Sequence, residues 1–219
     1  FFEITHERIA LSHLSSEFVF APPPSSYAFL KRPVDICSSI TLLLLLLMPL
    51  AIILLVVRLT SPGPAIYSQP RIGLNGRVFT LYKIRTMRNL DQDEESNFTA
   101  DDDPRITRVG RLLRALRIDE WPQFWNVLKG DMSLIGPRPE QPHWVDHFRK
   151  GIPFYDLRHA VRPGITGWAQ IKQGYASGVD ESTVKLEYDL YYIKHLSPNL
   201  DLRIALRTLN VLVRQFGAK

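Results

Sequence analysis

The stretch from Ile36 to Val57 contains twenty-two residues without a charged side chain, and no other feature constrains this chain as strongly. As an α-helix it would extend about 33 Å at about 1.5 Å per residue, enough to cross a hydrocarbon core of about 30 Å. Pro49 interrupts the run, and a proline inside a helix removes a backbone donor and bends the axis. We therefore expect a membrane helix with arms Ile36–Met48 and Leu50–Val57 and a kink at Pro49.

Both flanks of this apolar run are basic. Lys31 and Arg32 precede it, and the residues that follow before the next acid include Arg58, Arg71, Arg77, Lys83, Arg85 and Arg88. Cytoplasmic flanks collect Lys and Arg, so a spanning helix would be basic on one side only. The simplest explanation is a re-entrant helix that enters and leaves by the same face. An ordinary span with a tolerated proline fits the same pattern.

The composition narrows the classes of ligand. The net charge is +5, from 27 Lys and Arg against 22 Asp and Glu, which suits anionic lipids or phosphorylated ligands. We expect no nucleic-acid partner, because no nucleic-acid-binding motif is present. Cys37 is the single cysteine and lies within the apolar run, which excludes an internal disulfide and a thiolate zinc site.

Three regions follow from these patterns. Residues 1–30 include a Pro/Ser-rich stretch and are expected to be the tail or linker of a preceding region. Residues 31–63 hold the membrane helix. Residues 64–219 are long enough for one catalytic domain with its own core. We expect a predominantly helical α+β fold with a small β-hairpin and surface amphipathic helices.

The hairpin is expected between Pro64 and Met87, where two β-rich runs flank Asn75-Gly76, a strong signal for a two-residue turn. Pro70 restricts the first run to an edge strand. The acidic stretch from Asp91 to Asp103 is expected to be a surface loop.

Periodic apolar residues predict three helices further along. The first, Arg105–Ile118, carries arginines on the face opposite its apolar stripe. Such a face can bind a membrane surface or phosphates, and the alternative is a face that is only solvated. The second begins near Asp119, a good N-cap, and ends at Gly130. The third, Asp201–Phe216, is again amphipathic.

Asp119 and Glu120 are adjacent carboxylates at the expected start of the second helix. One could act as a nucleophile while the other helps to hold a hard cation such as Mg²⁺, and the helix dipole would keep both ionised. The simpler alternative is that Asp119 only caps the helix and Glu120 only complements its dipole.

Cationic residues accompany this pair, namely Lys83, Arg85, Arg114, Arg138 and Arg162. Two of them, Arg138 and Arg162, belong to Arg-Pro pairs in Gly/Pro-rich loops. Phosphoryl transfer from a diphosphate donor needs such a combination of carboxylates, cations and Gly-rich backbone, because electrostatic stabilisation supplies most of that catalysis. The pattern predicts this chemistry at a membrane.

At these residues the chain resembles the bacterial monotopic phosphoglycosyl transferases, also called polyprenyl-phosphate sugar-1-phosphate transferases. The resemblance runs from about Phe29 to the C-terminus. It rests on KRPVD, YKIRTM, TRVGRLLRALRIDEWPQFWNVLKGDMSLIGPRP, VRPGITGWAQI and YDLYYIKHLS, in this order. The tail resembles the linker of the larger members, and the last motif is most similar to the exopolysaccharide-type enzymes.

The resemblance implies a reaction and its residues. A sugar 1-phosphate would move from a UDP-sugar to polyprenyl phosphate with release of UMP, through a covalent phospho-sugar enzyme. Asp119 matches the nucleophile and Glu120 its Mg²⁺-associated partner. The positions expected to bind substrate phosphates are Arg114, Arg138, Arg162, Lys83 and Arg85.

The resemblance also implies a location and a shape. The family's membrane helix is re-entrant, with the catalytic domain on the cytoplasmic face of the bacterial inner membrane, and the larger members make a homodimer plausible. Some members bend the helix at a Ser-Pro pair, whereas this chain has Met48-Pro49 and lacks that hydroxyl.

Weaker signals and rival classes complete the analysis. His143 and His147 have the spacing of two metal ligands on one helix face, but no third ligand is evident. A catalytically silent membrane scaffold is disfavoured by the intact Asp119-Glu120 pair. A peripheral nucleic-acid-binding protein is disfavoured by the apolar run.

Overall fold

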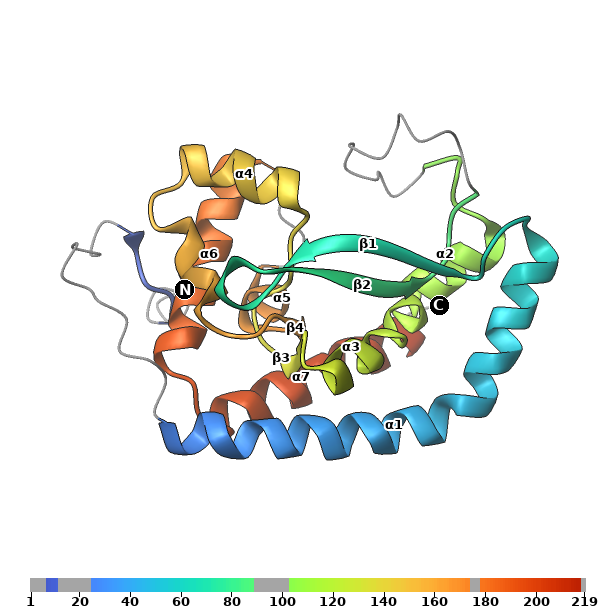
Figure 1. Ribbon diagram of the computed structural model, residues 1–219, viewed down its shortest axis with the longest axis horizontal. Helices are drawn as coiled ribbons and strands as arrows, with labels where there is room; N and C mark the ends of the chain where they lie inside the picture. Colours follow the sequence, from blue (N-terminus) through green and yellow to red (C-terminus); the bar gives the residue numbers. More distant parts are fainter. Residues whose placement is uncertain (1–6, 12–24, 89–102, 174–177, 218–219) are drawn as a thin grey trace.

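The computed structural model describes residues 7–11, 25–88, 103–173 and 178–217 (Figure 1). It confirms the predicted α+β class in which helix predominates, and its described strands form two small two-stranded sheets. Most of the expected N-terminal tail and of the acidic stretch Asp91–Asp103 lies outside the described residues.

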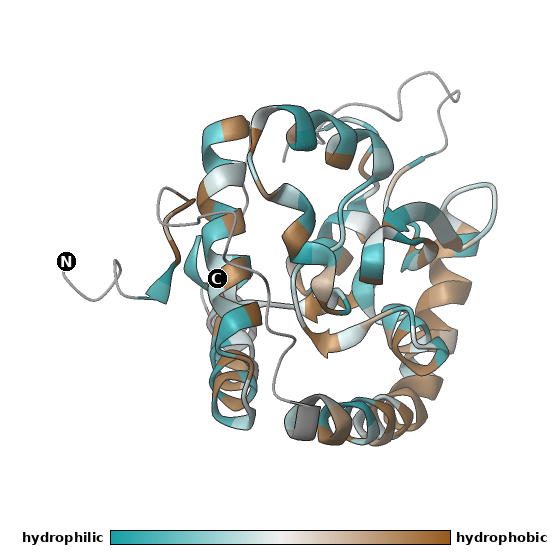
Figure 2. Cartoon of the chain, turned by 60° about the vertical axis from the view of Figure 1, so that its left-hand side comes forward, coloured by the Kyte–Doolittle hydropathy of each residue, from teal (hydrophilic) through white to brown (hydrophobic). Residues whose placement is uncertain are grey.

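The apolar run lies in α1 (Ser25–Thr60), one continuous helix with Pro33 and Pro49 inside it. It is long and apolar enough to cross a membrane. Figure 1 shows α1 running along one side of the domain and then turning towards the hairpin, as a helix interrupted by Pro49 is expected to do. Apolar residues dominate its course (Figure 2). Its outer face is exposed, with Leu44 at 69% and Met48 at 72%.

The hairpin is confirmed as β1 (Ile66–Ile72) paired antiparallel with β2 (Val78–Ile84). The predicted two-residue loop is wrong. Ile72 pairs with Val78, so the loop comprises residues 73–77 and contains the short turn η3 (Leu74–Gly76). Asn75 and Gly76 do adopt positive φ angles of 54° and 73°, because the chain reverses through them.

The predicted helix Arg105–Ile118 is shorter at both ends, since α2 covers Arg108–Ala115. At its start Thr107 caps the helix by accepting a hydrogen bond from the Gly110 amide at 2.8 Å. At its end Arg117 adopts a left-handed conformation with φ of 53°, which stops α2 and redirects the chain.

The sequence had indicated that Asp119 is the N-cap of the second helix, and this prediction is wrong. Asp119 and Glu120 lie in the one-turn segment η5 (Ile118–Glu120), and α3 (Gln123–Lys129) starts after Pro122. The left-handed Arg117 and the fixed φ of Pro122 confine the carboxylates to this tight turn between α2 and α3. Gly130 ends α3 with φ of 94°, as predicted.

The two Gly/Pro-rich loops meet through β3 (Ser133–Ile135) and β4 (Gly164–Thr166), which pair in parallel. The backbones approach so closely that a Cβ on Gly164 would lie 2.1 Å from the Gly136 amide nitrogen. Only glycine fits there, so this contact holds together the loops that carry Arg138 and Arg162.

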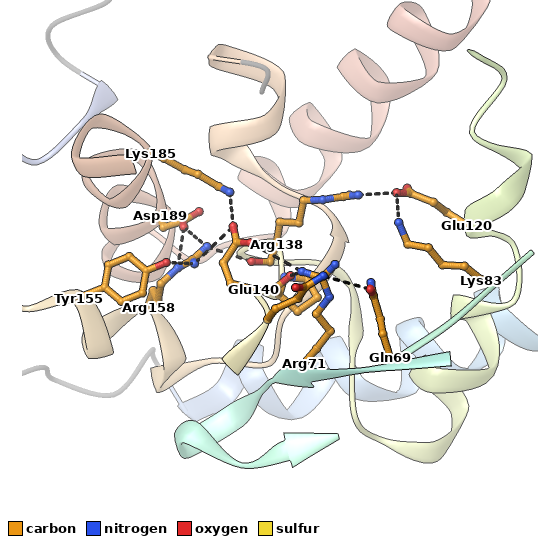
Figure 3. A network of polar contacts seen from close by, with 12 residues as sticks. Gln69, Arg71, Lys83, Glu120, Arg138, Glu140, Tyr155, Arg158, Lys185 and Asp189 are labelled. Carbon is orange, nitrogen blue, oxygen red and sulfur yellow. Dashed lines mark hydrogen bonds and ion pairs between the residues drawn. The ribbon is translucent and has the colours of Figure 1, made fainter. Parts of the chain in front are cut away.

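The remaining helices enclose the main core. They are α4 (Pro142–Gly151), η6 (Tyr155–Ala160), α5 (Trp168–Lys172), α6 (Val179–Lys194) and α7 (Pro198–Gly217), and α7 confirms the predicted C-terminal helix. Trp168, Tyr192 and Ile204 are fully enclosed in this core. Figure 3 shows Arg138 and Glu140, which follow β3, between Lys185 and Asp189 of α6 on one side and Glu120 on the other.

Candidate active site

Glu120 lies at the centre of a group of cations (Figure 3). Arg138 donates from Nη2 to its Oε1 at 2.6 Å, and Lys83 Nζ lies 3.5 Å from the same oxygen. Arg117 Nη1 lies 3.8 Å from Oε2. Glu120 is only 6% exposed, so these charges act with little screening by water.

These contacts fix the charge of Glu120. Burial alone would raise its pKa, but the positive charges of Arg138 and Lys83 outweigh that effect and lower the pKa to about 2. Burial acts on Lys83 as well and lowers the pKa of its ammonium group, against the attraction of Glu120. Glu120 is thus an ionised carboxylate at neutral pH, and it anchors Arg138 and Lys83.

Asp119 differs from its neighbour, although both are buried. Its carboxylate makes no hydrogen bond or ion pair with the described residues. Burial raises its pKa, while the charges of Lys83, Arg138 and Arg114 act in the opposite direction. Two adjacent carboxylates with such different surroundings can serve different roles. The oxygens of Asp119 have no partner among the described residues, whereas Oε1 of Glu120 is engaged by Arg138 and Lys83.

Arg114 is held beside this centre by the end of the hairpin. Its Nε donates to the Thr86 hydroxyl at 2.8 Å, and its charge reaches Asp119. The structure therefore brings together Asp119, Glu120, Lys83, Arg114 and Arg138 from the predicted set.

Arg85 and Arg162 lie elsewhere. Arg85 is buried at the end of α1, where it donates to the Pro62 and Ser61 carbonyl oxygens at 2.7 Å. Arg162 donates from Nε to the Gly130 carbonyl at 3.0 Å, at the far end of α3. The resemblance to the family had assigned both to substrate phosphates, but their hydrogen bonds lead to backbone carbonyl oxygens away from Asp119 and Glu120.

Asn126 positions Lys83 and was missed by the sequence analysis. Its side chain is fully buried, and it donates to the Thr80 carbonyl at 2.7 Å and accepts from the Tyr82 amide at 3.1 Å. This fork joins α3 to the edge of β2. These two hydrogen bonds fix β2 against α3 and thereby set the position of Lys83.

A second group of charged residues, which the sequence analysis also missed, holds the backbone of Arg138 in place. Arg158 of η6 is 3% exposed and donates to Asp189 of α6 at 2.8 Å and to the Arg138 carbonyl at 2.9 Å. It also donates to the Tyr155 hydroxyl at 2.8 Å. The backbone at Arg138 is thereby tied to the core of the domain, as Figure 3 shows.

Glu140 completes this support. It pairs with Lys185 of α6 and lies 3.7 Å from Arg71 of β1, and Arg71 also donates to the Pro139 carbonyl at 3.1 Å. Burial would raise the pKa of Glu140, but the charges of Lys185 and Arg158 lower it to about 2. The only sequence signal was the spacing of Lys185 and Asp189, four residues apart on a helix face that turns inward.

Asp119 and Glu120 carry oxygen donors of the kind that Mg²⁺ takes in proteins. Among the described residues no cluster of three or more His, Cys, Asp or Glu side chains could hold a metal. Mg²⁺ is commonly bound through one or two carboxylates together with substrate phosphates and water. Asp119 and Glu120 provide such donors. His143 and His147 instead contact Trp144, with ring centroids 4.9 and 5.9 Å apart.

Carboxylates surrounded by cations, beside a long apolar helix, suit phosphoryl transfer at a membrane. The family model for the bacterial sugar transferases matches residues 26–215, and this chain belongs to that family. The match confirms the resemblance inferred from the sequence motifs.

Relatives extend this result. The chain is 46% identical over 213 residues to the UDP-N-acetylgalactosamine-undecaprenyl-phosphate N-acetylgalactosaminephosphotransferase of Aeromonas hydrophila, covering 97% of this chain and 50% of the relative. It is 43% identical over 182 residues to the UDP-glucose:undecaprenyl-phosphate glucose-1-phosphate transferase of Escherichia coli, covering 82% and 39%. It is 40% identical over 189 residues to the exopolysaccharide production protein PSS of Rhizobium leguminosarum, covering 82% and 92%. The chain thus spans half or less of the first two relatives.

Proposed function

We propose that this chain transfers a sugar 1-phosphate from a UDP-sugar to a polyprenyl phosphate and releases UMP. The observation that carries the proposal is the contrast between Asp119, whose carboxylate makes no ion pair among the described residues, and Glu120, which is paired with Arg138 and Lys83. The substrate classes come from relatives named for UDP-sugars and undecaprenyl phosphate.

In the first step an oxygen of Asp119 attacks the phosphorus that carries the sugar. A bond forms between this oxygen and phosphorus, and the bond from phosphorus to the bridging oxygen of the diphosphate breaks. UMP leaves with that oxygen. Lys83, Arg114 and Arg138 place positive charge beside the reacting group, where it stabilises the charge that develops on the phosphoryl oxygens.

In the second step an oxygen of the polyprenyl phosphate attacks the same phosphorus. The new bond completes a polyprenyl diphosphate sugar, and the Asp119 carboxylate is released. Glu120 keeps Arg138 and Lys83 in place throughout, because it stays ionised. This reaction would begin the membrane stage of exopolysaccharide or other glycoconjugate assembly.

Asp119 and Glu120 are the residues that would hold Mg²⁺. When bound, the ion would neutralise charge on the diphosphate. Because Arg138 and Lys83 already bind Oε1 of Glu120, Asp119 offers the oxygens that have no partner among the described residues.

We further propose that α1 is re-entrant and that the domain lies on the cytoplasmic face of the bacterial inner membrane. Both ends of α1 bind the same domain. Lys31 pairs with Asp201 of α7 at 2.5 Å, and Arg85 binds the carbonyl oxygens at the other end. A helix held at both ends on one side supports a bent path into the bilayer and back.

UMP release tests the reaction. The purified protein is incubated with undecaprenyl phosphate, Mg²⁺ and a panel of UDP-sugars. Release with one donor, abolished in Asp119→Asn, is expected. A folded protein that releases no UMP with any donor would favour a silent scaffold instead.

A further inference from the structure

A second basic site lies between the start of α1 and the β3–β4 sheet. It is a cavity of about 130 Å³. Its polar lining comes from segments far apart in the sequence, namely Lys31, Arg32, Asp35, Ser133, Arg162 and Tyr192. Three cations thus face one carboxylate.

Arg32 and Arg162 supply the excess charge. Lys31 is matched by Asp201 at 2.5 Å, and Asp35 accepts a hydrogen bond from the Leu134 amide at 3.2 Å. Arg32 and Arg162 form no ion pair with a carboxylate of the described residues. Burial lowers the pKa of Arg32 and the positive charge of Arg162 lowers it further, against the attraction of Asp35. Two guanidinium groups that repel each other at one cavity are a site for an anion.

The same two arginines bind the carbonyl groups at the C-terminal end of α3. Arg32 donates to the Val127 carbonyl at 2.7 Å and to the Leu128 carbonyl at 3.1 Å, and Arg162 donates to the Gly130 carbonyl. These bonds orient both groups at the negative end of the helix. They use only part of the donors of each guanidinium, which has five N–H groups.

The cavity is separate from the candidate active site. Asp119 and Glu120 precede α3, whereas Arg32 and Arg162 bind its C-terminal end. Seven helical residues span about 10 Å at about 1.5 Å each. None of the carboxylates or cations around Glu120 lines the cavity.

The position of the cavity along α1 indicates the kind of anion that it would bind. The residues of α1 that line it, Lys31, Arg32 and Asp35, come directly before Ile36, where the uncharged stretch begins. On the outer face of the same turns, Phe29 is 81% exposed and Val34 is 62% exposed. An anion in the cavity would thus lie at the level of lipid headgroups, with apolar side chains beside it for a hydrocarbon chain.

We propose that this cavity binds the phosphate group of a membrane lipid, with Arg32 and Arg162 as its ligands and the hydrocarbon chain along the outer face of α1. A phospholipid headgroup and a polyprenyl phosphate share this chemistry. The site goes beyond the proposed reaction, because it lies away from Asp119 and requires no turnover.

Lipid binding is measured by native mass spectrometry on the intact protein in detergent micelles. The probes are phosphatidylglycerol, undecaprenyl phosphate, phosphatidylcholine and inorganic phosphate. Preferential retention of phosphatidylglycerol would identify a phospholipid headgroup, and preferential retention of undecaprenyl phosphate would identify the polyprenyl lipid. Both results support the proposal, and UMP release plays no part in the readout.

Variants separate the site from general attraction to anions. Arg162→Gln is expected to weaken retention of the anionic lipid about tenfold, since a charge-assisted hydrogen bond is lost. Arg162→Lys should recover part of that loss. Asp35→Asn removes the one carboxylate of the lining and should strengthen retention severalfold, an effect that mere damage to the fold would not produce. Lys150→Gln, on the exposed face of α4, is the matched control.

Three results would overturn the proposal. The first is that the parent and Arg162→Gln retain the anionic lipids equally. The second is that Lys150→Gln loses as much lipid retention as Arg162→Gln. The third is that inorganic phosphate binds as strongly as either lipid. Thermal unfolding of each variant shows that it is folded, and Asp35→Asn provides the test if Arg162→Gln is not.

Discussion

The guanidinium of Arg138 donates to the carboxylate of Glu120 across 2.6 Å and joins the loop after β3 to the turn between α2 and α3. This bond keeps Glu120 ionised and occupied. Asp119, one residue earlier, has no such partner among the described residues. The pair therefore divides into an anchor for cations and a carboxylate that is open to substrate, and the predictions below test that division.

Asp119→Asn should reduce UMP release at least about a thousandfold, because an amide cannot act as the nucleophile. The same change should leave the melting temperature unchanged or raise it. Burial raises the pKa of Asp119, so the folded state disfavours its ionised form, and the amide avoids that cost. Near-normal turnover in a folded Asp119→Asn protein would remove Asp119 from the mechanism.

Glu120 should make the fold sensitive to acid. Its pKa is about 2 in the folded protein against an ordinary value of 4.5. A lowered folded-state pKa means that the stabilisation is present above pH 4.5 and is lost as the pH falls from 4.5 towards 2. The shift corresponds to about 3 kcal/mol of unfolding free energy. Thermal unfolding followed from pH 6 to pH 2.5 measures it.

Glu120→Gln should flatten part of this acid dependence, while Glu140, whose pKa is also about 2, keeps its own contribution. Asp146→Asn is the control, since that carboxylate is exposed on α4. An acid profile for Glu120→Gln that matches the parent would contradict the ion pairs described for Glu120.

Arg158 should act on turnover through Arg138, because it donates to the Arg138 carbonyl at 2.9 Å. Arg158→Lys keeps a charge near Asp189 but loses the planar fork. We expect it to lower kcat about tenfold in the parent and to have little further effect in an Arg138→Ala background. A double-mutant cycle measures this coupling.

The melting temperatures of the same variants separate an effect on turnover from an effect on stability. Arg158→Lys weakens the buried pair with Asp189 in both backgrounds, so the melting temperature should fall by similar amounts in each. Equal factors of lost turnover in both backgrounds would mean that Arg158 is purely structural.

Divalent metal should be required for turnover. EDTA is expected to stop UMP release and added Mg²⁺ to restore it, because two carboxylates and a diphosphate offer hard oxygen ligands to the ion. Melting curves with and without EDTA check that the fold itself survives. Full turnover in EDTA would exclude a role for the ion.

The re-entrant path of α1 predicts that both of its ends face the cytoplasm. Cysteines at Phe29 and Leu59, which are 81% and 76% exposed, should both react with a reagent that reaches only the cytoplasmic side. Cys37 must first be replaced, since it is itself exposed. Labelling of the two positions from opposite sides would establish a spanning helix.

The amino-acid sequence was sufficient for the elements whose signals are local. The apolar run, the chain reversal at Asn75-Gly76 and the glycine stop at Gly130 each depend on a short stretch of chain, and each was found, although the loop at the reversal is longer than the predicted two residues. The motif around Asp119 and Glu120 likewise identified the family.

The ends of α2 were beyond such reasoning. The apolar spacing continues through residues 105–118, but Ile106 pairs with Met87 and Arg117 adopts a left-handed conformation. Tertiary contacts outweigh helix propensity at both places. Asp119 consequently lies in a tight turn rather than at a helix cap.

The tertiary structure alone decided which cation meets which carboxylate. Arg138 and Arg162 stand in similar Arg-Pro pairs, yet the first binds Glu120 and the second meets Arg32 at the other end of α3. The buried set around Arg158 was likewise invisible, because a charged residue in a sequence normally indicates a surface position. Local sequence determines which segments form helices, strands and turns. The packing of segments far apart in the chain determines where their charges are buried and paired, since burial is a property of the folded chain as a whole.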